Sequence, residues 1–213
     1  MTSVLADFWS FVTPQPEQRV HVTRFMAASE LYRASATYNT GSIDAAEATL
    51  LWLLAERIEA RVVIEVGTFI GTSTMALSSA PTVQAVYTCD VSNDCFPSGG
   101  VIQTYPKQTS TQMLKDLVAR GVKADLCFFD GVLSDEDASL LMRVTHPDTV
   151  YAVHDYNYGP KIRTRRGVTK HEMVPRKGIG NIKLLWPTHL PKHSMIEPMP
   201  NTTVAALVPE AFL

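Results

Sequence analysis

The stretch RVVIEVGTFIGTSTMALSSA at residues 61–80 decides the fold class of this chain. The run VVIEV at 62–66 is rich in β-branched residues, which is typical of a buried strand. Gly67 and Gly71 allow a tight turn and the close approach of a ligand, and residues 72–79 can begin a helix. A strand that turns through glycines into a helix is typical of a ligand-binding loop, so the sequence predicts a binding site here.

The spacing of the two glycines argues against a dinucleotide. The sequence Gly67-Thr68-Phe69-Ile70-Gly71 does not fit the pattern G-x-G-x-x-G, in which a pyrophosphate lies at the helix N-terminus. The order E-x-G-x-x-x-G-x-S from Glu65 to Ser73 resembles instead the first motif of class I S-adenosylmethionine-dependent methyltransferases, whose glycine loop passes under the methionine part of the cofactor. That cofactor is cationic at sulfur, which gives a reason for the acid at Glu65. The alternative is an ordinary strand-to-helix turn of an α/β protein.

Strands and helices alternate along most of the chain. The pattern predicts an α/β fold with a Rossmann-like, doubly wound sheet that is mostly parallel, has helices on both faces and binds its ligand at the carboxyl ends of the strands. Near the C-terminus, residues 195–196 and 202–208 flank a proline-rich turn, which predicts a hairpin and hence one antiparallel strand. Helices are predicted at 44–60, 110–120 and 134–144, and strands at 62–66, 83–89, 101–105, 124–129 and 149–153.

Two of these helices carry capping signals at their N-termini. Asp44 and Glu47 stand at the spacing of a capping box, and Ser110 can cap the next helix. We therefore expect Glu47 to serve the local structure of its helix.

Length and composition favour one domain over residues 1–213, with a helical cap segment at 1–43. The formal net charge of −2 gives no global attraction to nucleic acid or to a membrane. The apolar run near the N-terminus is short and contains Asp7, so we expect neither a signal peptide nor a membrane span. Three cysteines, Cys89, Cys95 and Cys127, suit reduced thiols in a cytoplasmic protein better than disulfides.

Acidic residues follow the predicted strands at Glu65, Asp90, Asp130 and Asp155. Asp90 comes 19 positions after Gly71, where an acid can accept hydrogen bonds from both hydroxyls of a ribose, and this resembles the ribose-binding acid of the methyltransferases. The resemblance implies a cofactor site made of Glu65, Gly67, Thr68, Phe69, Gly71, Thr72, Ser73, Asp90, Val91 and Asp130.

Asp130 and Asp155 end strands that we expect to be neighbours, about 4.8 Å apart. Two carboxylates this close repel each other, and a hard divalent cation such as Mg²⁺ or Ca²⁺ would relieve the repulsion. The segments FFDG and VYAVHDYNYG resemble regions of the catechol O-methyltransferase-like and macrocin O-methyltransferase groups, which implies a metal site with Asn157 as a third ligand. The match is imperfect, because Tyr156 separates Asp155 from Asn157, and a site of solvated carboxylates without metal is the alternative.

His154, together with Asp130 and Asp155, forms the predicted catalytic group. With a pKa near the working pH, His154 could take the proton from an attacking hydroxyl, and a structural histidine is the alternative. The other five histidines lack comparable context and are expected at the surface: His21, His146, His171, His189 and His193.

The segment at residues 161–177 is strongly basic, with Glu172 as its single acid. Placed as a flap at 159–180 over the site, it would attract an anionic substrate, because guanidinium groups grip carboxylate and phosphate oxygens. The alternative is a solvated loop. Aromatic residues are not interleaved within it, which counts against single-stranded nucleic acid.

Together these features predict an S-adenosylmethionine-dependent O-methyltransferase that acts on a hydroxyl of a small molecule, such as a sugar or a phenolic natural product. Two alternatives stay open: a nucleic-acid methyltransferase that uses the basic segment, and a protein that binds the cofactor without turnover. The sequence does not identify the methyl acceptor. It is also compatible with a homo-oligomer as well as with a monomer.

Overall fold

The residues at 61–80 fold as their sequence predicts. Strand β1 (Val62–Val66) leads through Gly71, which has a φ of 81°, into helix α4 (Thr72–Ser78). The structure is a computed structural model, and it describes residues 43, 45–91, 99–156, 158–165, 168–175, 177–196 and 203–212. The predicted cap segment at 1–42 and the predicted helix cap Asp44 therefore lie outside the described residues.

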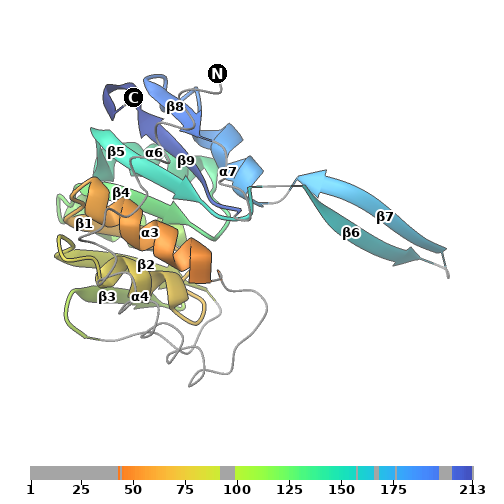
Figure 1. Cartoon of the computed structure of the whole chain (residues 1–213), viewed down its shortest axis with the longest axis horizontal. Coiled ribbons are helices and arrows are strands. Elements are labelled where there is room, and N and C mark those ends of the chain that lie inside the picture. Colours follow the sequence, from red (N-terminus) through yellow and green to blue (C-terminus); the bar gives the residue numbers. More distant parts are fainter. Residues whose placement is uncertain are drawn as a thin grey trace.

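A seven-stranded sheet forms the centre of the molecule, in the order β3-β2-β1-β4-β5-β9-β8 (Figure 1). The first five strands along the chain are parallel, and β9 alone runs antiparallel to its neighbours β5 and β8, which confirms the predicted antiparallel strand. The remaining strands are β2 (Ala85–Asp90), β3 (Ile102–Pro106), β4 (Ala124–Phe129), β5 (Thr145–Val153), β8 (His193–Ile196) and β9 (Ala205–Pro209).

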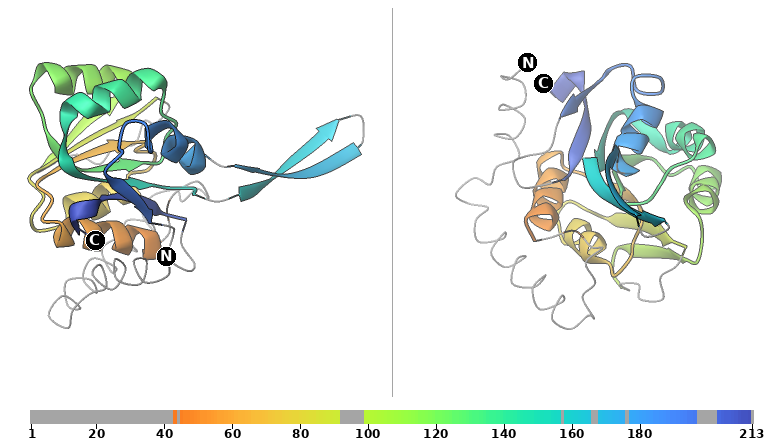
Figure 2. Two further views of the ribbon diagram at one scale, coloured as in Figure 1. Left: turned by 90° about the horizontal axis from the view of Figure 1, so that it is seen from above. Right: turned by 90° about the vertical axis from the view of Figure 1, so that its right-hand side faces the viewer.

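Helices cover both faces of the sheet, as the alternating pattern predicts (Figure 2). Helix α3 (Ala45–Arg57) and α4 lie on one face, and α5 (Ser110–Ala119), α6 (Asp135–Val144) and α7 (Lys177–Leu185) lie on the other. Helix α5 is capped by Thr109 in a capping box with Gln112, so the prediction of Ser110 as the cap is wrong by one residue. Ser110 is instead the first helical residue, and its hydroxyl binds Asp137.

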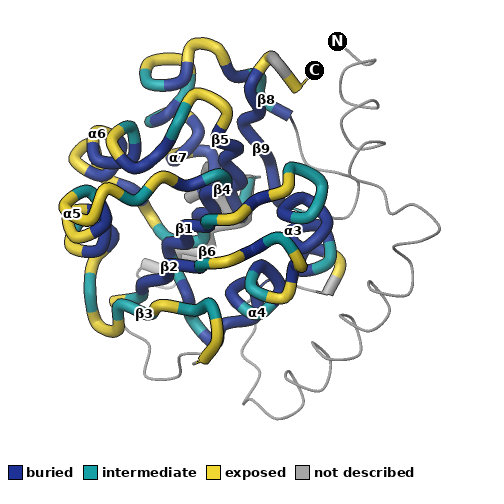
Figure 3. The backbone as a smooth tube through the Cα atoms, turned by 90° about the vertical axis from the view of Figure 1, so that its left-hand side faces the viewer, coloured by how far each residue is buried: buried dark blue, intermediate teal, exposed yellow. Residues whose placement is uncertain are grey.

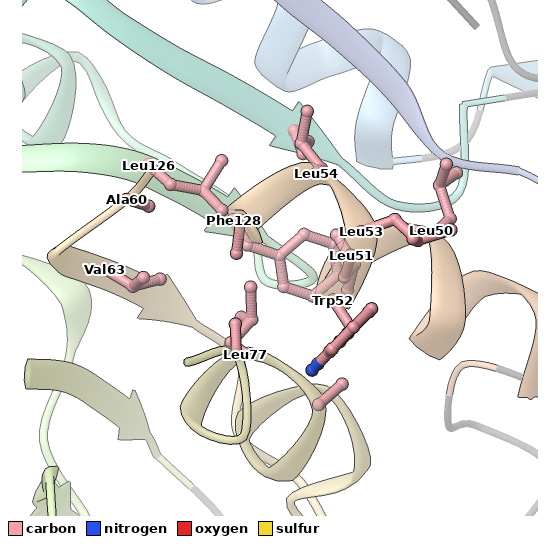
Figure 4. Packing of buried hydrophobic residues seen from close by; sticks show 14 of the residues in the cluster. Leu50, Leu51, Trp52, Leu53, Leu54, Ala60, Val63, Leu77, Leu126 and Phe128 are labelled. Carbon is pink, nitrogen blue, oxygen red and sulfur yellow. The ribbon is translucent and has the colours of Figure 1, made fainter. Parts of the chain in front are cut away.

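Two hydrophobic cores result from the alternation of side chains along the buried strands. In β4, Leu126 and Phe128 pack toward α3 and α4, where Trp52 and Leu77 are fully or almost fully buried (Figure 4). Cys127 and its neighbour Phe129 belong to the core under α5, α6 and α7. The sheet interior is accordingly buried, while exposed residues gather on the outer helices and loops (Figure 3). Cys89 and Cys127 are buried free thiols, as expected, and Cys95 lies outside the described residues.

A two-stranded antiparallel hairpin, β6 (Tyr158–Arg165) and β7 (Val168–Pro175), forms a second, separate sheet. It projects from the body of the molecule between β5 and α7 (Figures 1 and 2). The basic segment is therefore a hairpin, and residues 177–180 of the predicted flap belong to α7. Among the helices that the structure describes, none has the length and apolar character needed to cross a membrane.

Candidate functional site

A cavity of about 480 Å³ lies at the carboxyl ends of β1, β2 and β4. Four of the predicted cofactor residues line it, and they are Gly67, Asp90, Val91 and Asp130. The first residues of α5 and α6 complete the wall. Because the strand order changes direction between β1 and β4, the cavity occupies the switch point of the sheet, where open α/β sheets bind their ligands.

The glycine at position 67 serves the contact between two loops beside this cavity. Gly67 has a φ of 99°, and a Cβ placed there would lie 2.8 Å from the backbone nitrogen of Gly131 and 2.9 Å from the carbonyl carbon of Asp130. Residues 130 and 131 in turn donate backbone hydrogen bonds of 2.8 Å to the carbonyl of Val66. The group that approaches Gly67 closely is therefore the backbone of residues 130 and 131, where the sequence predicts a ligand. This contact places Asp130 beside the glycine loop.

Glu65 lies fully buried beneath the glycine loop and connects β1 to its neighbours. Its Oε2 accepts a hydrogen bond from Thr74 in α4 and one of 2.6 Å from Thr88 in β2. Burial raises the pKa of Glu65 to about 7, against the lowering effect of hydrogen bonds from Ser73, Thr74 and Thr88, and the nearby charge of Asp130 raises it further. Near neutral pH this acid therefore titrates in the folded protein.

The start of α4 and the loop before it are packed into the protein. Thr68, Thr72 and Ser73 are all buried, so these predicted cofactor residues shape the loop from within. Phe69 adopts a positive φ of 46°, and its backbone N–H donates a hydrogen bond of 2.9 Å to Oδ2 of Asp90. Asp90 thus anchors the loop and also lines the cavity.

His154 lies between two carboxylates in a buried chain of hydrogen bonds. Its Nδ1 is 2.8 Å from Oδ1 of Asp130, and its Nε2 is 3.2 Å from Oε2 of Glu47 in α3. Glu47 is 5% exposed, and its Oε1 accepts bonds of 2.8 Å from both the backbone N–H and the hydroxyl of Thr203. The sequence predicted Glu47 only as a capping residue, so its role in this chain is a finding of the structure.

The two carboxylates beside His154 influence the protonation state of its ring, and the role of His154 as a general base stays a prediction. Burial alone would lower the pKa of His154, but the hydrogen bonds to Asp130 and Glu47 outweigh burial and raise the pKa to about 9. The ring is then an imidazolium at neutral pH, and both of its N–H groups donate to carboxylates. A ring in this state holds both carboxylates in place, and it would accept a proton only in its neutral form.

Asp130, His154 and Asp155 each offer a ligand atom within 4.8 Å of the others. The turn that brings them together is unusual, because Asp155 has a positive φ of 56°, a backbone conformation that favours glycine. The two carboxylates suit a hard divalent cation, whereas the nitrogens of His154 are engaged with Asp130 and Glu47. Asn157, the third predicted ligand, lies outside the described residues.

Helix α7 braces the two loops that carry this group. A Cβ at Gly178 would lie 2.2 Å from the carbonyl oxygen of His154, so only glycine lets the helix approach the turn at 154–156. The buried side chain of Asn181 accepts a bond of 3.0 Å from the backbone N–H of Leu133 and donates one of 2.8 Å to the carbonyl of Gly131. Sequence reasoning missed both residues, and the glycine within an otherwise helical stretch was the available signal.

The prediction that His193 lies at the surface is wrong. His193 is 5% exposed, its Nε2 is 2.9 Å from the carbonyl of Thr149, and its ring meets Tyr151 edge-on. Burial lowers the pKa of His193, so the ring is neutral. A second cavity of about 380 Å³ lies beside it at the amino end of β5, away from the acidic residues described above.

No family model matches the sequence, and a search among curated proteins finds no significant relative. Solved structures do match. An O-methyltransferase from Bacillus cereus in complex with SAH is 18% identical, with a TM-score of 0.60 and 92% of each chain covered. The O-methyltransferase TomG from Streptomyces achromogenes, in complex with SAM, is 18% identical, with a TM-score of 0.58 over 97% of this chain and 96% of that one. The chain has the fold of these methyltransferases.

The methyltransferase fold extends over nearly the whole chain. A third structure, the SAH-bound methyltransferase PaMTH1 from Podospora anserina, is 12% identical, with a TM-score of 0.56 over 92% of this chain and 97% of that one. The resemblance seen at 65–73 is therefore confirmed at the level of the fold, and the cavity described above lies at the ligand-binding edge of that fold.

Proposed function

We propose that this protein is an S-adenosylmethionine-dependent methyltransferase that methylates a hydroxyl of a small molecule. The observation that carries the proposal is the cavity at the switch point, where the glycine loop, Asp90 and Asp130 converge on a methyltransferase fold. Similar structures that hold SAH or SAM support the choice of ligand. A fold alone hosts many functions, so the proposal depends on these residues.

In this proposal the cofactor lies along the carboxyl edge with its ribose at Asp90. When bound, S-adenosylmethionine would supply a methyl group on a sulfonium. The methyl would pass to the acceptor oxygen in one in-line displacement, with S-adenosylhomocysteine as the leaving group and the hydroxyl proton lost to solvent. Glu65, ionised above its pKa of about 7, places a negative charge beneath the loop that would carry the sulfonium. Gly67 and Val91 line the pocket, and the loop beside it is formed by Thr68, Phe69, Gly71, Thr72 and Ser73.

Asp130, which also lines the cofactor cavity, and Asp155 would form the acceptor side of the site. Held within 4.8 Å of each other, they fit a divalent cation such as Mg²⁺, which would lower the pKa of an acceptor hydroxyl bound to it. His154 would keep Asp130 in place through the 2.8 Å bond. The main work of the protein is then to orient the acceptor oxygen toward the methyl group.

The hairpin favours an anionic acceptor. Its register pairs Lys161 with Glu172, Arg163 with Lys170 and Arg165 with Val168, so the charged residues of both strands occupy one set of alternating positions. Tyr158, Ile162 and Met173 belong to the other set, which carries no charged residue apart from the titratable His171. The described basic residues of the hairpin therefore share one set of register positions, and β6 begins three residues after Asp155.

Calorimetry with S-adenosylmethionine and S-adenosylhomocysteine, with and without Mg²⁺, tests the proposal. The variant Asp90→Asn keeps an acceptor for the N–H of Phe69 but cannot bind both ribose hydroxyls as a carboxylate does. We expect it to bind S-adenosylhomocysteine about tenfold more weakly, the equivalent of one charge-assisted hydrogen bond. Asp148→Asn, at an exposed position in β5, is the control and should bind normally.

Two outcomes would change the proposal. If the wild-type protein binds neither compound, the proposed function is wrong. If binding and turnover are the same with Mg²⁺ and with a chelator, the cofactor assignment stands and the metal assignment is removed.

A further inference from the structure

We propose that Glu47 is a positioning residue of the reaction site, which fixes the ring of His154 and through it the carboxylate of Asp130. The inference rests on the proposed function, because it assigns Glu47 to the site that would bind the cofactor. It goes beyond that function, because Glu47 belongs to helix α3 and lines neither the cavity nor the glycine loop.

Glu47 uses both carboxylate oxygens to hydrogen-bond other residues of the protein, His154 and Thr203. One carboxylate oxygen meets Nε2 of His154 at 3.2 Å, and the other accepts two bonds of 2.8 Å from Thr203, which precedes β9. Glu47 is 5% exposed and His154 is 8% exposed. A carboxylate removed from water to this extent is costly unless such bonds satisfy it, so the pairing is specific.

The geometry of the imidazole explains how Glu47 acts at a distance. The ring has two nitrogens, and a rotation that moves Nδ1 away from Asp130 must also move Nε2 away from Glu47. Glu47 therefore locks the orientation in which Nδ1 meets Asp130 at 2.8 Å. Because Asp130 lines the cavity, its orientation sets part of the cofactor site. Outer partners of this kind commonly change affinity or activity by about 10- to 100-fold when removed.

A purely structural role is the competing explanation, since Glu47 also ties α3 to Thr203. A double-mutant cycle separates the two. Glu47→Leu, which removes the bonds at similar volume, and His154→Asn are made singly and together, and S-adenosylhomocysteine affinity is measured by calorimetry. If Glu47 acts through His154, we expect each single variant to lose about tenfold and the double variant to lose no more than the larger single loss. Losses that multiply would overturn the proposal.

The conservative variant Glu47→Gln provides the second arm in case Glu47→Leu fails to fold. Its amide oxygen can still accept from Thr203, and its amide nitrogen can hydrogen-bond Nε2 of a neutral His154, so the ring stays tethered. We expect Glu47→Gln to retain affinity within about threefold. Glu56→Gln, on the same helix and away from the cavity, is the matched control.

A readout that needs no cofactor keeps this proposal distinct from the proposed function. In protein labelled with ¹⁵N at histidine, the ring signals of His154, assigned by their loss in His154→Asn, should move in Glu47→Gln and stay unchanged in Glu56→Gln. Unchanged His154 signals in Glu47→Gln would overturn the inference. Absence of S-adenosylhomocysteine binding to the wild type, with the shift present, would reject the proposed function and leave the contact between Glu47 and His154 standing.

Discussion

At the scale of single residues, buried carboxylates dominate the behaviour of the site. The folded pKa of Glu65 is about 7 and its ordinary value is 4.5, because burial disfavours the charge more than the hydroxyls of Thr74 and Thr88 stabilise it. A carboxyl whose pKa is raised by folding stabilises the fold fully below its unfolded pKa. That contribution is lost as the pH rises from about 4.5 through 7.

Replacing Glu65 with Gln should remove this loss. The amide stays neutral at every pH and can still accept from Thr88, so the variant should match the wild type near pH 4 and exceed it at pH 8. The shift from 4.5 to about 7 corresponds to an upper difference of about 3 kcal/mol in the free energy of unfolding. Urea unfolding at pH 4, 6.5 and 8 measures it, with Glu136→Gln on the surface as control. Parallel stability curves for Glu65→Gln and wild type would contradict the argument.

At the scale of elements, helix α7 holds the site together from the far side of the acidic loops. Gly178 lets the helix contact the turn at 154–156, and Asn181 binds the loop at 131–133 through both ends of its amide. One helix therefore fixes the loops that follow β4 and β5, and with them the separation of Asp130 and Asp155. The two glycines of α7 should therefore differ in how well they tolerate a larger side chain.

The two glycines of α7 offer a matched pair of substitutions. Gly178→Ala places a Cβ 2.2 Å from the carbonyl oxygen of His154, so the helix or the turn must shift, and we expect a loss of about 1–3 kcal/mol in the free energy of unfolding. At Gly180 a Cβ meets none of the described atoms within 4 Å, so Gly180→Ala should be neutral or stabilise by up to about 1 kcal/mol. Thermal unfolding compares them. Equal changes in stability for the two variants would show that the contact between Gly178 and the turn at 154–156 does not contribute to stability.

At the scale of the whole molecule, the hairpin of β6 and β7 is separate from the seven-stranded sheet and follows β5 in the chain. β6 and β7 pair only with each other among the described strands, and the seven-stranded sheet is complete without them. Two-stranded sheets on their own are marginally stable, so the hairpin contributes little to the fold. We propose instead that its basic positions attract an anionic acceptor.

Replacing residues 159–174 with a short glycine-serine turn tests this separation of roles. The deletion removes five basic residues and Glu172, which takes the formal net charge from −2 to −6. We expect an unchanged affinity for S-adenosylhomocysteine and a Tm within about 4 °C of the wild type, a change of less than about 1 kcal/mol. A large fall in Tm would show that the hairpin belongs to the core.

The alternative of a nucleic-acid methyltransferase is tested by titrating the wild type with a single-stranded oligonucleotide at increasing salt concentration. If the hairpin grips a phosphate backbone, affinity should fall steeply with salt and disappear in the deletion variant. We expect weak binding with little salt dependence, because the site is proposed to take a small anionic acceptor.

The sequence by itself determined the alternation of strands and helices, the glycine turn at 67–71, the single antiparallel strand and the edge at which the acids gather. Each of these follows from signals within a few neighbouring positions, such as β-branched runs, turn residues and the side-chain period of a strand. The cap of α5 was wrong by one residue because Thr109 and Ser110 are both good caps, and only backbone geometry distinguishes them.

Only the tertiary structure joined Glu47 to His154 and Thr203, which are 107 and 156 positions away in the sequence. It also showed that glycine is required at 178, that His193 is buried, and that His154 lies between two carboxylates. These properties depend on which surfaces pack together and how far each group is removed from water. Neither the distance between chain-remote groups nor their burial is encoded in a local pattern, so the chemistry of the site was decided by packing.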